Sequence, residues 1–492
     1  MPARRVRLLL GGTWADGRGG EPLPLASPAT GEEVALVEQG TRADVEAAVG
    51  HAWRAHALLA RMSPFERATR CHAVADRLLA RRDEIARDIT LEQGKPYATQ
   101  ARAEVEVAAG MFRDAAECAK RLVGEVLPSA EPGKRVLTFR QARGVYGIIT
   151  PWNFPLAIPS EYLSAGLATG NAMVWKPSEW TPLSAAHLAR AFLDAGVPEG
   201  TLNLVLGAPD QVGDEVAANP GIVAVGLTGS SRTGELVARR AAGKPLLLEL
   251  GGNGPTIIFA DADLERAVAR TAAGCFDNAG QVCNATERIL VQRSVHDEVV
   301  AGLVEAARGQ RLGSPFDPET TLGPLTNEPT AAKMDAHLAD AVARGAEVLS
   351  GGDRAGGHPT RLYYQATVID RVSREMRLNL EETFGPVAPV LTFTSEEEAL
   401  ELAASCPLGL NAGLFTRDLG RALHVAERLR CGTVNVNETS CYWQPHTPAG
   451  GFTGTRSGMG RVGGVYTLLE MTQLKTVTID VDAEPGGAVG RR

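Results

Sequence analysis

Gly144-Val-Tyr-Gly-Ile-Ile-Thr150 is a short apolar run, rich in the β-branched and aromatic residues that favour strands. Helical sequence follows it, and then a second strand-like run, Ala172-Met-Val-Trp-Lys176. The alternation continues through two more strand candidates, Leu202–Leu206 and Ile222–Leu227. Short apolar strands that alternate with amphipathic helices predict an α/β fold, in which helices cover both faces of a parallel sheet.

The rest of the chain extends this pattern in both directions. A second α/β series begins at Pro255-Thr-Ile-Ile-Phe259 and runs to about residue 437. Upstream, Thr41 and Ser63 are candidate N-caps of two helices, and the second helix is expected to stop at Gly94. A further helix is expected over residues 100–123. With 492 residues and roughly 150 residues per domain, the chain has room for about three domains.

Composition excludes several classes of protein. Acidic residues number 58 against 50 basic ones, and the net charge of -8 is spread along the chain. No basic face predicts nucleic-acid binding, and no apolar run approaches the ~20 residues of a membrane span. The seven cysteines are an odd number without a CxxC pair. They argue against a disulfide framework and a metal site, and they favour the reducing conditions of the cytoplasm.

Cys283 ends the segment Phe276-Asp-Asn-Ala-Gly-Gln-Val-Cys283. A free cysteine is most often a small buried hydrophobic residue, and that interpretation stays open. The residues before it favour another role, because Asn278, Gly280 and Gln281 are poor material for a core and a glycine lets the backbone approach a ligand closely. A thiolate is a strong nucleophile, although a thiol with a pKa of about 8.5 needs local help to ionise.

Glu249 and Asn153 are two further candidates. Glu249 interrupts the apolar run Leu246–Leu250, where a carboxylate either faces water on an edge strand or is buried and acts as a base with a raised pKa. Asn153 lies in a Pro-flanked loop after Thr150, at the carboxyl end of a strand, where open α/β sheets bind their ligands. Its amide could stabilise an oxyanion, or it could only close an Asx-turn.

A second loop suits a phosphate group. In Leu227-Thr-Gly-Ser-Ser-Arg-Thr-Gly234 a strand passes into a helix, so backbone N–H groups near Gly229 and Ser230 can bind an anion at the helix N-terminus. The spacing is not the GxGxxG pattern, and alone it is a weak signal. Upstream, Lys176 and Glu179 end another strand and suit ribose hydroxyls, with a simple turn as the alternative.

Together these residues resemble the aldehyde dehydrogenase superfamily, of the NAD(P)-dependent, hydrolytic type with a cysteine nucleophile. The resemblance covers about residues 7–480. Its most specific parts are Leu248-Glu-Leu-Gly-Gly252 and Phe276–Cys283, whose glutamate and cysteine are 34 positions apart, as in the family. In sequence order, the features that carry it are Asn153, Lys176, Glu179, Gly229, Glu249, Cys283 and Glu382-Thr-Phe-Gly-Pro386.

The resemblance implies a mechanism. Cys283 would attack the aldehyde carbonyl, while the amide of Asn153 and the backbone N–H of Cys283 hold the oxyanion. After hydride transfer to the nicotinamide, Glu249 would activate the water that hydrolyses the thioester, so that the product is a carboxylic acid. Two alternatives are a relative that passes the acyl group to CoA and a catalytically silent, structural member of the family. The presence of Glu249 argues against the first, and that of all three residues against the second.

The resemblance also implies the cofactor contacts. Lys176 and Glu179 would bind the adenosine ribose, where a carboxylate repels a 2′-phosphate, so that NAD is favoured over NADP. Gly229 and Ser230 would lie by the pyrophosphate, and Phe384 by the nicotinamide ring. The full set of expected cofactor contacts is Thr150, Pro151, Trp152, Lys176, Ser178, Glu179, Gly229, Ser230, Gly234, Leu250, Gly251, Glu382 and Phe384.

For the fold, the resemblance implies three parts. Residues 1–119 and 143–249 would form a Rossmann-like cofactor-binding domain, and residues 250–452 an α/β catalytic domain. Residues 120–142 and 470–482 would form a small β element that bridges subunits. A homodimer or a homotetramer is therefore expected, with a small-molecule aldehyde as the other partner.

The aldehyde side departs from the family pattern. Tyr162 stands where the family usually has a lysine linked to proton relay, so proton release is expected to pass through Glu161 or Tyr162 instead. Glu161 aligns with a tunnel position often taken by an apolar aromatic residue. The substrate is therefore expected to carry a polar or cationic group, as in an amino-aldehyde or a semialdehyde. The residues expected to line the tunnel are Phe154, Glu161, Asn284, Tyr442, Trp443 and His446.

Overall fold

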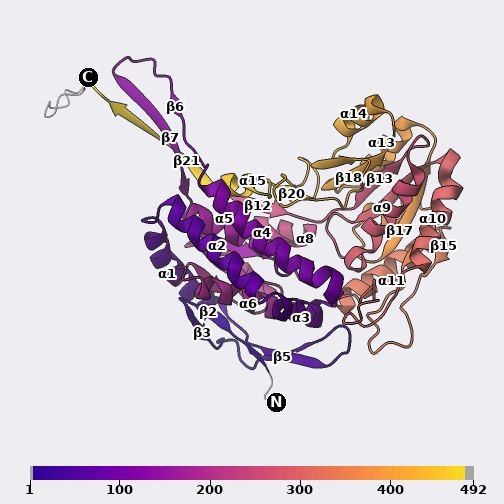
Figure 1. Cartoon of the computed structure of the whole chain (residues 1–492), viewed down its shortest axis with the longest axis horizontal. Coiled ribbons are helices and arrows are strands. Elements are labelled where there is room, and N and C mark those ends of the chain that lie inside the picture. Colours follow the sequence, from indigo (N-terminus) through magenta and orange to yellow (C-terminus); the bar gives the residue numbers. More distant parts are fainter. Residues whose placement is uncertain (1–3, 483–492) are drawn as a thin grey trace.

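The computed structural model describes residues 4–482, which form two α/β lobes and a three-stranded arm that extends from the first lobe (Figure 1). Each lobe has its own hydrophobic core. The first core consists of residues between Val6 and Leu250, together with Ala449, Val462, Leu468 and Met471 from near the end of the chain. The second core consists of residues between Ile257 and Leu429. Within residues 4–482, no helix combines the length and the apolar character needed to cross a membrane.

An eight-stranded sheet forms the centre of the first lobe. In spatial order its strands are β20 (Gly458–Met459), β12 (Leu246–Glu249), β11 (Ala224–Thr228), β8 (Val145–Ile149), β9 (Ala172–Lys176), β10 (Leu202–Leu204), β2 (Leu8–Leu10) and β3 (Thr13–Ala15). The five strands from β12 to β10 are parallel, and antiparallel strands join only at the edges. Since β8, β9 and β11 are buried along their whole length, they consist of continuous apolar runs, and the predicted parallel sheet is confirmed.

Helices on both faces of the sheet complete this lobe, and one sequence expectation about them is wrong. Ser63 does cap α2 through a capping box with Glu66, but α2 ends at Ala80 rather than running on to Gly94. Arg81 leaves the helical conformation with φ −116° and ψ 20°, and a separate helix follows it. The helices are α1 (Arg42–Leu59), α2 (Pro64–Ala80), α3 (Arg82–Gln93), α4 (Arg102–Ala119), α5 (Ala157–Thr169), α6 (Pro182–Asp194), α7 (Asp214–Ala218) and α8 (Ser231–Arg240).

A seven-stranded sheet forms the second lobe. In spatial order its strands are β15 (Glu347–Ser350), β16 (Thr367–Asp370), β17 (Val387–Phe393), β14 (Thr286–Gln292), β13 (Gly254–Ile258), β18 (Asn411–Phe415) and β19 (Thr433–Val436). All of these pairs are parallel except β15–β16. The helices of this lobe include α9 (Leu264–Phe276), α10 (His296–Arg308), α11 (Glu328–Ala343), α13 (Glu396–Ala404) and α14 (Leu419–Arg428).

The arm consists of β6 (Val126–Leu127), β7 (Lys134–Ala142) and β21 (Thr472–Asp480), and β21 lies beside β7 in space although it is far from it in the sequence (Figure 1). β7 and β21 pair antiparallel along their full length, from Thr472 opposite Ala142 to Asp480 opposite Lys134. Within residues 4–482, Figure 1 shows no helix that runs along the length of the β7–β21 pair. Sheets this small need further packing to be stable, which makes the arm a candidate contact surface.

The strand order places a ligand site between the lobes. From β8 the chain passes outward to β9 and β10, and then returns to the other side of β8 to form β11 and β12. The connections therefore diverge at the boundary between β8 and β11, and open α/β sheets bind ligands at the carboxyl ends of strands at such a switch point. The loops after β8 and β11 carry Asn153 and Gly229, and β12 ends in Glu249.

Candidate functional site

Two cavities meet between the lobes. One has a volume of about 350 Å³ and contains apolar side chains from α4 and α5, and the other has a volume of about 510 Å³ and lies over the carboxyl ends of β8 and β11. Three residues line both cavities: Thr228, Glu249 and Cys283. A ligand in either cavity therefore reaches the same thiol and the same carboxyl group.

Glu249 and Cys283 share a buried, electrostatically unusual environment. Burial raises the pKa of Glu249 to about 8; the carboxyls of Glu161 and Glu382 raise it further, and hydrogen bonds with Cys283 and Thr228 oppose the rise. Burial and the neighbouring Glu249 carboxyl also raise the pKa of the Cys283 thiol well above its usual value. The thiol is thus protonated at rest, beside a carboxyl group whose pKa suits a general base near neutral pH.

Asn153 lies in the wall of the larger cavity. Its position depends on Lys95, a residue for which the sequence analysis predicted no role. The Lys95 ammonium is fully buried, donates to the backbone carbonyl of Asn153 at 2.8 Å, and pairs with the Glu104 carboxylate at 2.6 Å. The other Glu104 oxygen accepts the backbone N–H groups of Leu156 and Ala157. Lys95 follows a helix-ending glycine and precedes a proline, so in sequence it looked only like part of a helix terminus.

The loop before Cys283 has an unusual backbone. Asn278, Ala279 and Gly280 have positive φ values of 47°, 55° and 72° in succession. The Asn278 amide donates to the Asn153 carbonyl at 3.1 Å, and the Asn153 amide donates to the Gln281 carbonyl at 3.1 Å. Residues in the left-handed region cost free energy unless their surroundings hold them, and here these hydrogen bonds do so. The two loops therefore define each other's position.

Glycines allow the close approach that brings Cys283 to Glu249. A Cβ atom on Gly252 would lie 2.2 Å from the backbone oxygen of Cys283, and one on Gly280 would lie 2.0 Å from the backbone oxygen of Gly385. A side chain at Gly252 would push the end of β12 away from the Cys283 loop, and one at Gly280 would push that loop away from the segment at Gly385. Among the described residues, the backbone N–H of Cys283 has no acceptor, so it is available to a ligand.

The larger cavity has the features of a dinucleotide site. Ser230 caps α8, and the helix N-terminus directs backbone N–H groups and a partial positive charge at the position suited to a phosphate. Phe384 has a φ of 63°, and Glu287 holds this conformation by accepting its N–H and that of Thr383. Seven of the expected cofactor contacts line this cavity: Pro151, Trp152, Gly229, Ser230, Gly251, Glu382 and Phe384. Sequence reasoning missed Trp180, Arg232, Asn327 and Lys333, which line it too.

The other expected cofactor contacts do not line the cavity: Thr150, Lys176, Ser178, Glu179, Gly234 and Leu250. Gly234 and Leu250 pack against each other, since a Cβ on Gly234 would lie 2.4 Å from the Leu250 side chain. Lys176 pairs with Glu179 at 3.1 Å beside Trp180, with Glu179 about half exposed. Glu179 directly precedes Trp180, which does line the cavity, so a ligand that extended past Trp180 would approach this carboxylate.

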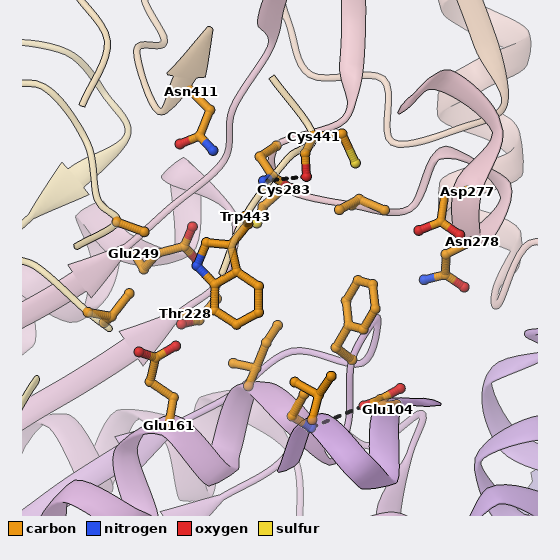
Figure 2. A pocket seen from close by; sticks show the side chains of 18 of the residues that line it. Glu104, Glu161, Thr228, Glu249, Asp277, Asn278, Cys283, Asn411, Cys441 and Trp443 are labelled. Atoms are coloured by element: carbon orange, nitrogen blue, oxygen red, sulfur yellow. Dashed lines mark hydrogen bonds between the residues drawn. The ribbon is translucent and has the colours of Figure 1, made fainter. Parts of the chain in front are cut away.

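The smaller cavity contains four of the six expected tunnel residues, Phe154, Glu161, Asn284 and Trp443 (Figure 2). The expectation for Tyr442 and His446 is not met, because their side chains are exposed and neither lines the cavity. In this irregular segment Trp443 turns toward the cavity while Tyr442 accepts a hydrogen bond from Gln444 at 2.8 Å. Sequence reasoning missed a group of lining residues from α4 and the turn before it, including Thr99, Gln100, Ala103, Val107 and Met111.

Tyr162 does not reach the smaller cavity. It is buried, shares a hydrogen bond of 2.8 Å with the Thr228 hydroxyl, and burial raises its pKa well above the usual value. Since Thr228 also bonds to Glu249, Tyr162 orients the hydroxyl beside the base. Of the two expected routes for proton release, only Glu161 faces the cavity directly.

Comparisons with known proteins bear on the whole chain. The model described as "Aldehyde dehydrogenase family" matches residues 14–477. The mitochondrial succinate-semialdehyde dehydrogenase of Arabidopsis thaliana is 38% identical over 478 residues, covering 96% of this chain and 89% of the relative. A succinate-semialdehyde dehydrogenase of Escherichia coli, named for NADP(+), is 36% identical over 479 residues and covers 96% and 98%. The crystal structure of betaine aldehyde dehydrogenase from Staphylococcus aureus in complex with NAD+ matches with a TM-score of 0.94 and 33% identity, covering 99% of this chain and 97% of that one.

The buried Lys95–Glu104 pair generates a prediction about stability and rate. Lys95→Met should lower the free energy of unfolding by about 3–5 kcal/mol, because it leaves a buried carboxylate without its cation. Urea unfolding measures this loss. The double variant Lys95→Met/Glu104→Gln should recover most of the stability, since glutamine keeps an acceptor for the Leu156 and Ala157 N–H groups. Both variants should remain slow catalysts, because neither holds the Asn153 carbonyl; full activity in the double variant would contradict that role.

Proposed function

The chain belongs to the aldehyde dehydrogenase family, whose members use NAD(P), and we propose that its own reaction is the oxidation of a polar aldehyde to the carboxylic acid, with water as the acyl acceptor. One observation carries the proposal. Cys283 and Glu249 are shared by a mostly apolar cavity of about 350 Å³ and by a cavity with the features of a dinucleotide site. An aldehyde and a nicotinamide bound in the two cavities would meet at one thiol.

In the proposed mechanism, the Cys283 thiol loses its proton to solvent, and the thiolate forms a C–S bond to the aldehyde carbon. The Asn153 amide and the backbone N–H of Cys283 stabilise the oxyanion, a contribution of about 3 kcal/mol for one donor. A nicotinamide held in the larger cavity would supply the hydride acceptor, and loss of hydride from this carbon would leave a thioester on Cys283. Glu249 then removes a proton from water, the water oxygen attacks the thioester, and the carboxylic acid leaves as the thiolate is restored.

NAD is the proposed cofactor in preference to NADP. The carboxylate of Glu179 supports this choice, since it would accept hydrogen bonds from ribose hydroxyls and repel a 2′-phosphate. Its ion pair with Lys176 keeps it oriented beside Trp180. Relatives of the chain include both an enzyme named for NADP(+) and one solved with NAD+, so the preference is a property of this chain's own residues.

For the whole molecule, we propose the division into a cofactor-binding domain, a catalytic domain and a bridging β element, and assembly into a homodimer or homotetramer through the arm. Register supports one face of the arm as the contact, because Phe139, Val477 and Ile479 lie on the same face of the β7–β21 pair. Phe139 is 42% exposed and Ile479 is 44% exposed. All seven cysteines are free thiols, which supports a reducing compartment such as the cytoplasm.

Glu249→Gln tests the proposed mechanism. A glutamine cannot accept a proton from water, so incubation with an aldehyde and NAD should leave the acyl group on the enzyme. Intact-protein mass spectrometry should show a mass increase of one acyl group, and peptide mapping should place it on Cys283. In the wild-type enzyme, hydrolysis of the thioester should accelerate as the pH rises through about 8, because the base acts only when it is ionised.

The alternatives have distinct outcomes in the same experiment. A CoA-acylating enzyme would release product only when CoA is added, whereas the proposed enzyme forms NADH and acid without it. A catalytically silent protein would give no NADH with any aldehyde and no acyl adduct on Cys283. The Cys283→Ala variant is the matched control, because it removes the acyl acceptor and should show no adduct.

Glu179→Gln tests the cofactor preference. Removing the carboxylate should raise kcat/KM for NADP by roughly fivefold, which is the effect of about 1 kcal/mol of charge repulsion. The value for NAD should fall, since an amide is a weaker acceptor for ribose hydroxyls. Ser178→Ala is the control for a neutral change beside the same site. An unchanged ratio of NADP to NAD efficiency would overturn the assignment of Glu179.

Phe139→Glu tests the arm as the contact between subunits. Phe139→Glu removes the aromatic side chain of the proposed contact face, which also carries Lys475 and Arg135, and places a carboxylate there. The oligomer should dissociate, so the molecular mass from light scattering should fall toward that of a single chain. Thr478→Glu adds the same charge on the opposite face of the β7–β21 pair and should leave the mass unchanged. Equal effects of the two substitutions would show that the Phe139 face is not the contact.

A further inference from the structure

The aldehyde cavity has an unusual charge balance. Its lining includes four carboxyl side chains and no lysine, arginine or histidine. The four are Glu104, Glu161, Glu249 and Asp277. The remaining surface is mainly apolar. A bound substrate therefore meets carboxyl groups that attract positive charge, and the described residues that line the cavity offer a negative group no cationic side chain.

Two of these carboxyls are already accounted for. Glu249 is the proposed base, and Glu104 is neutralised by the buried ammonium of Lys95. Asp277 accepts a hydrogen bond from the Gln100 amide at 2.9 Å. Figure 2 shows Asp277 on the opposite side of the cavity from Glu161. Of the two carboxyls that remain, Glu161 is the one beside the indole of Trp443.

Glu161 is a carboxyl group without a cation. One of its oxygens accepts a hydrogen bond from the Thr467 hydroxyl at 3.2 Å, and within the described part of the chain it forms no ion pair. Burial raises its pKa to about 7. Keeping an ionisable group in such a place costs free energy unless a partner compensates it, and a cationic ligand would supply that partner.

Aromatic rings lie beside this carboxyl. Figure 2 shows the Glu161 side chain rising from α5 toward the indole of Trp443, and the ring of Phe154 also lines the cavity. The faces of aromatic rings attract ammonium groups, and Trp attracts them most strongly. A carboxylate and an indole on one cavity wall are the chemistry of an ammonium site, whereas a carboxylate ligand would need the donors and positive charge that this wall lacks.

We infer that the substrate is an aldehyde with an ammonium group at the end remote from the carbonyl, bound by Glu161 and Trp443 while the carbonyl carbon reaches Cys283. The inference rests on the proposed function and narrows its substrate class. It separates this chain from the relatives named for succinate semialdehyde, since the carboxylate of that substrate would face the Glu161 carboxyl. Repulsion between these two negative charges disfavours binding of succinate semialdehyde.

Three aldehydes test the inference. 4-(Trimethylammonio)butanal and 5,5-dimethylhexanal have the same shape and differ only in one positive charge, and succinate semialdehyde supplies a negative one. Rates of NADH formation should give a kcat/KM for the cation at least about tenfold above that for its neutral isostere, with succinate semialdehyde lowest. A neutral isostere that matches the cation, or succinate semialdehyde as the best of the three, would overturn the inference.

Glu161→Gln connects the preference to its residue. The ratio of kcat/KM for the cation to that for the neutral isostere should fall by about tenfold in this variant. Asp114→Asn is the matched control. Asp114 and Glu161 both line a third, small cavity that is distinct from the two between the lobes, but Asp114 does not line the aldehyde cavity. The Asp114→Asn variant should leave this ratio unchanged. An equal fall in that variant would overturn the role of Glu161, because it would mean that any nearby negative charge sets the preference.

The failures of the two proposals are distinguishable. NADH from the neutral isostere without any preference for the cation would remove the inference and leave aldehyde oxidation standing. No NADH from any of the three aldehydes, or from benzaldehyde, together with no acyl adduct on Cys283 in Glu249→Gln, would remove the proposed function itself.

Discussion

A buried ammonium group is the interaction on which the site depends. Lys95 has no exposed surface on its side chain, yet it contacts the Glu104 carboxylate, the Asn153 carbonyl and the face of the Phe154 ring. A charge in that position is tolerable only if each of these partners is in place. The end of α3, the first turn of α4 and the loop after β8 are therefore coupled to one another through a single side chain. The Asn153 loop in turn bonds to the loop that carries Cys283.

Carboxyl groups do the complementary work. Glu249, Glu287 and Glu382 are all buried near the junction of the lobes, and burial raises the pKa of each into the range of about 7 to 8. Glu287 holds the strained backbone at Phe384 by accepting the N–H groups of Thr383 and Phe384, while Glu249 faces the thiol. Carboxyl groups thus have two roles at this junction: one positions the backbone because it accepts N–H groups, and the other can transfer a proton because it lies beside the thiol. Glu161 contacts neither a strained backbone segment nor the thiol. A positive charge on the substrate therefore explains why a carboxyl group lies in this cavity.

Local sequence patterns predicted the elements well and the boundaries between helices less well. The strands of the first sheet are continuous apolar runs, so periodicity and length were sufficient to locate them. The break at Arg81 lacks a glycine or a proline, the residues whose backbone chemistry marks a helix end, and so the expected helix ran on to Gly94. Sequence patterns were also insufficient in the tunnel segment. Residues 442–446 form no helix or strand, so there is no regular repeat from which to predict which side chains point into the cavity.

The sequence alone determined the fold class, the family and the identity of Cys283, Glu249 and Asn153 as candidates, because these depend on local patterns and on spacing along the chain. Tertiary structure decided which residues share a cavity. Lys95, Thr228 and Arg232 carry no local signal of a role, and Glu161 is only one of many glutamates until its surroundings are known. The physical reason is that charge compensation and cavity lining are sums over contacts between distant segments. Only the folded chain shows that Thr228, Glu249 and Cys283 lie in both cavities and that the aldehyde cavity lacks a cation.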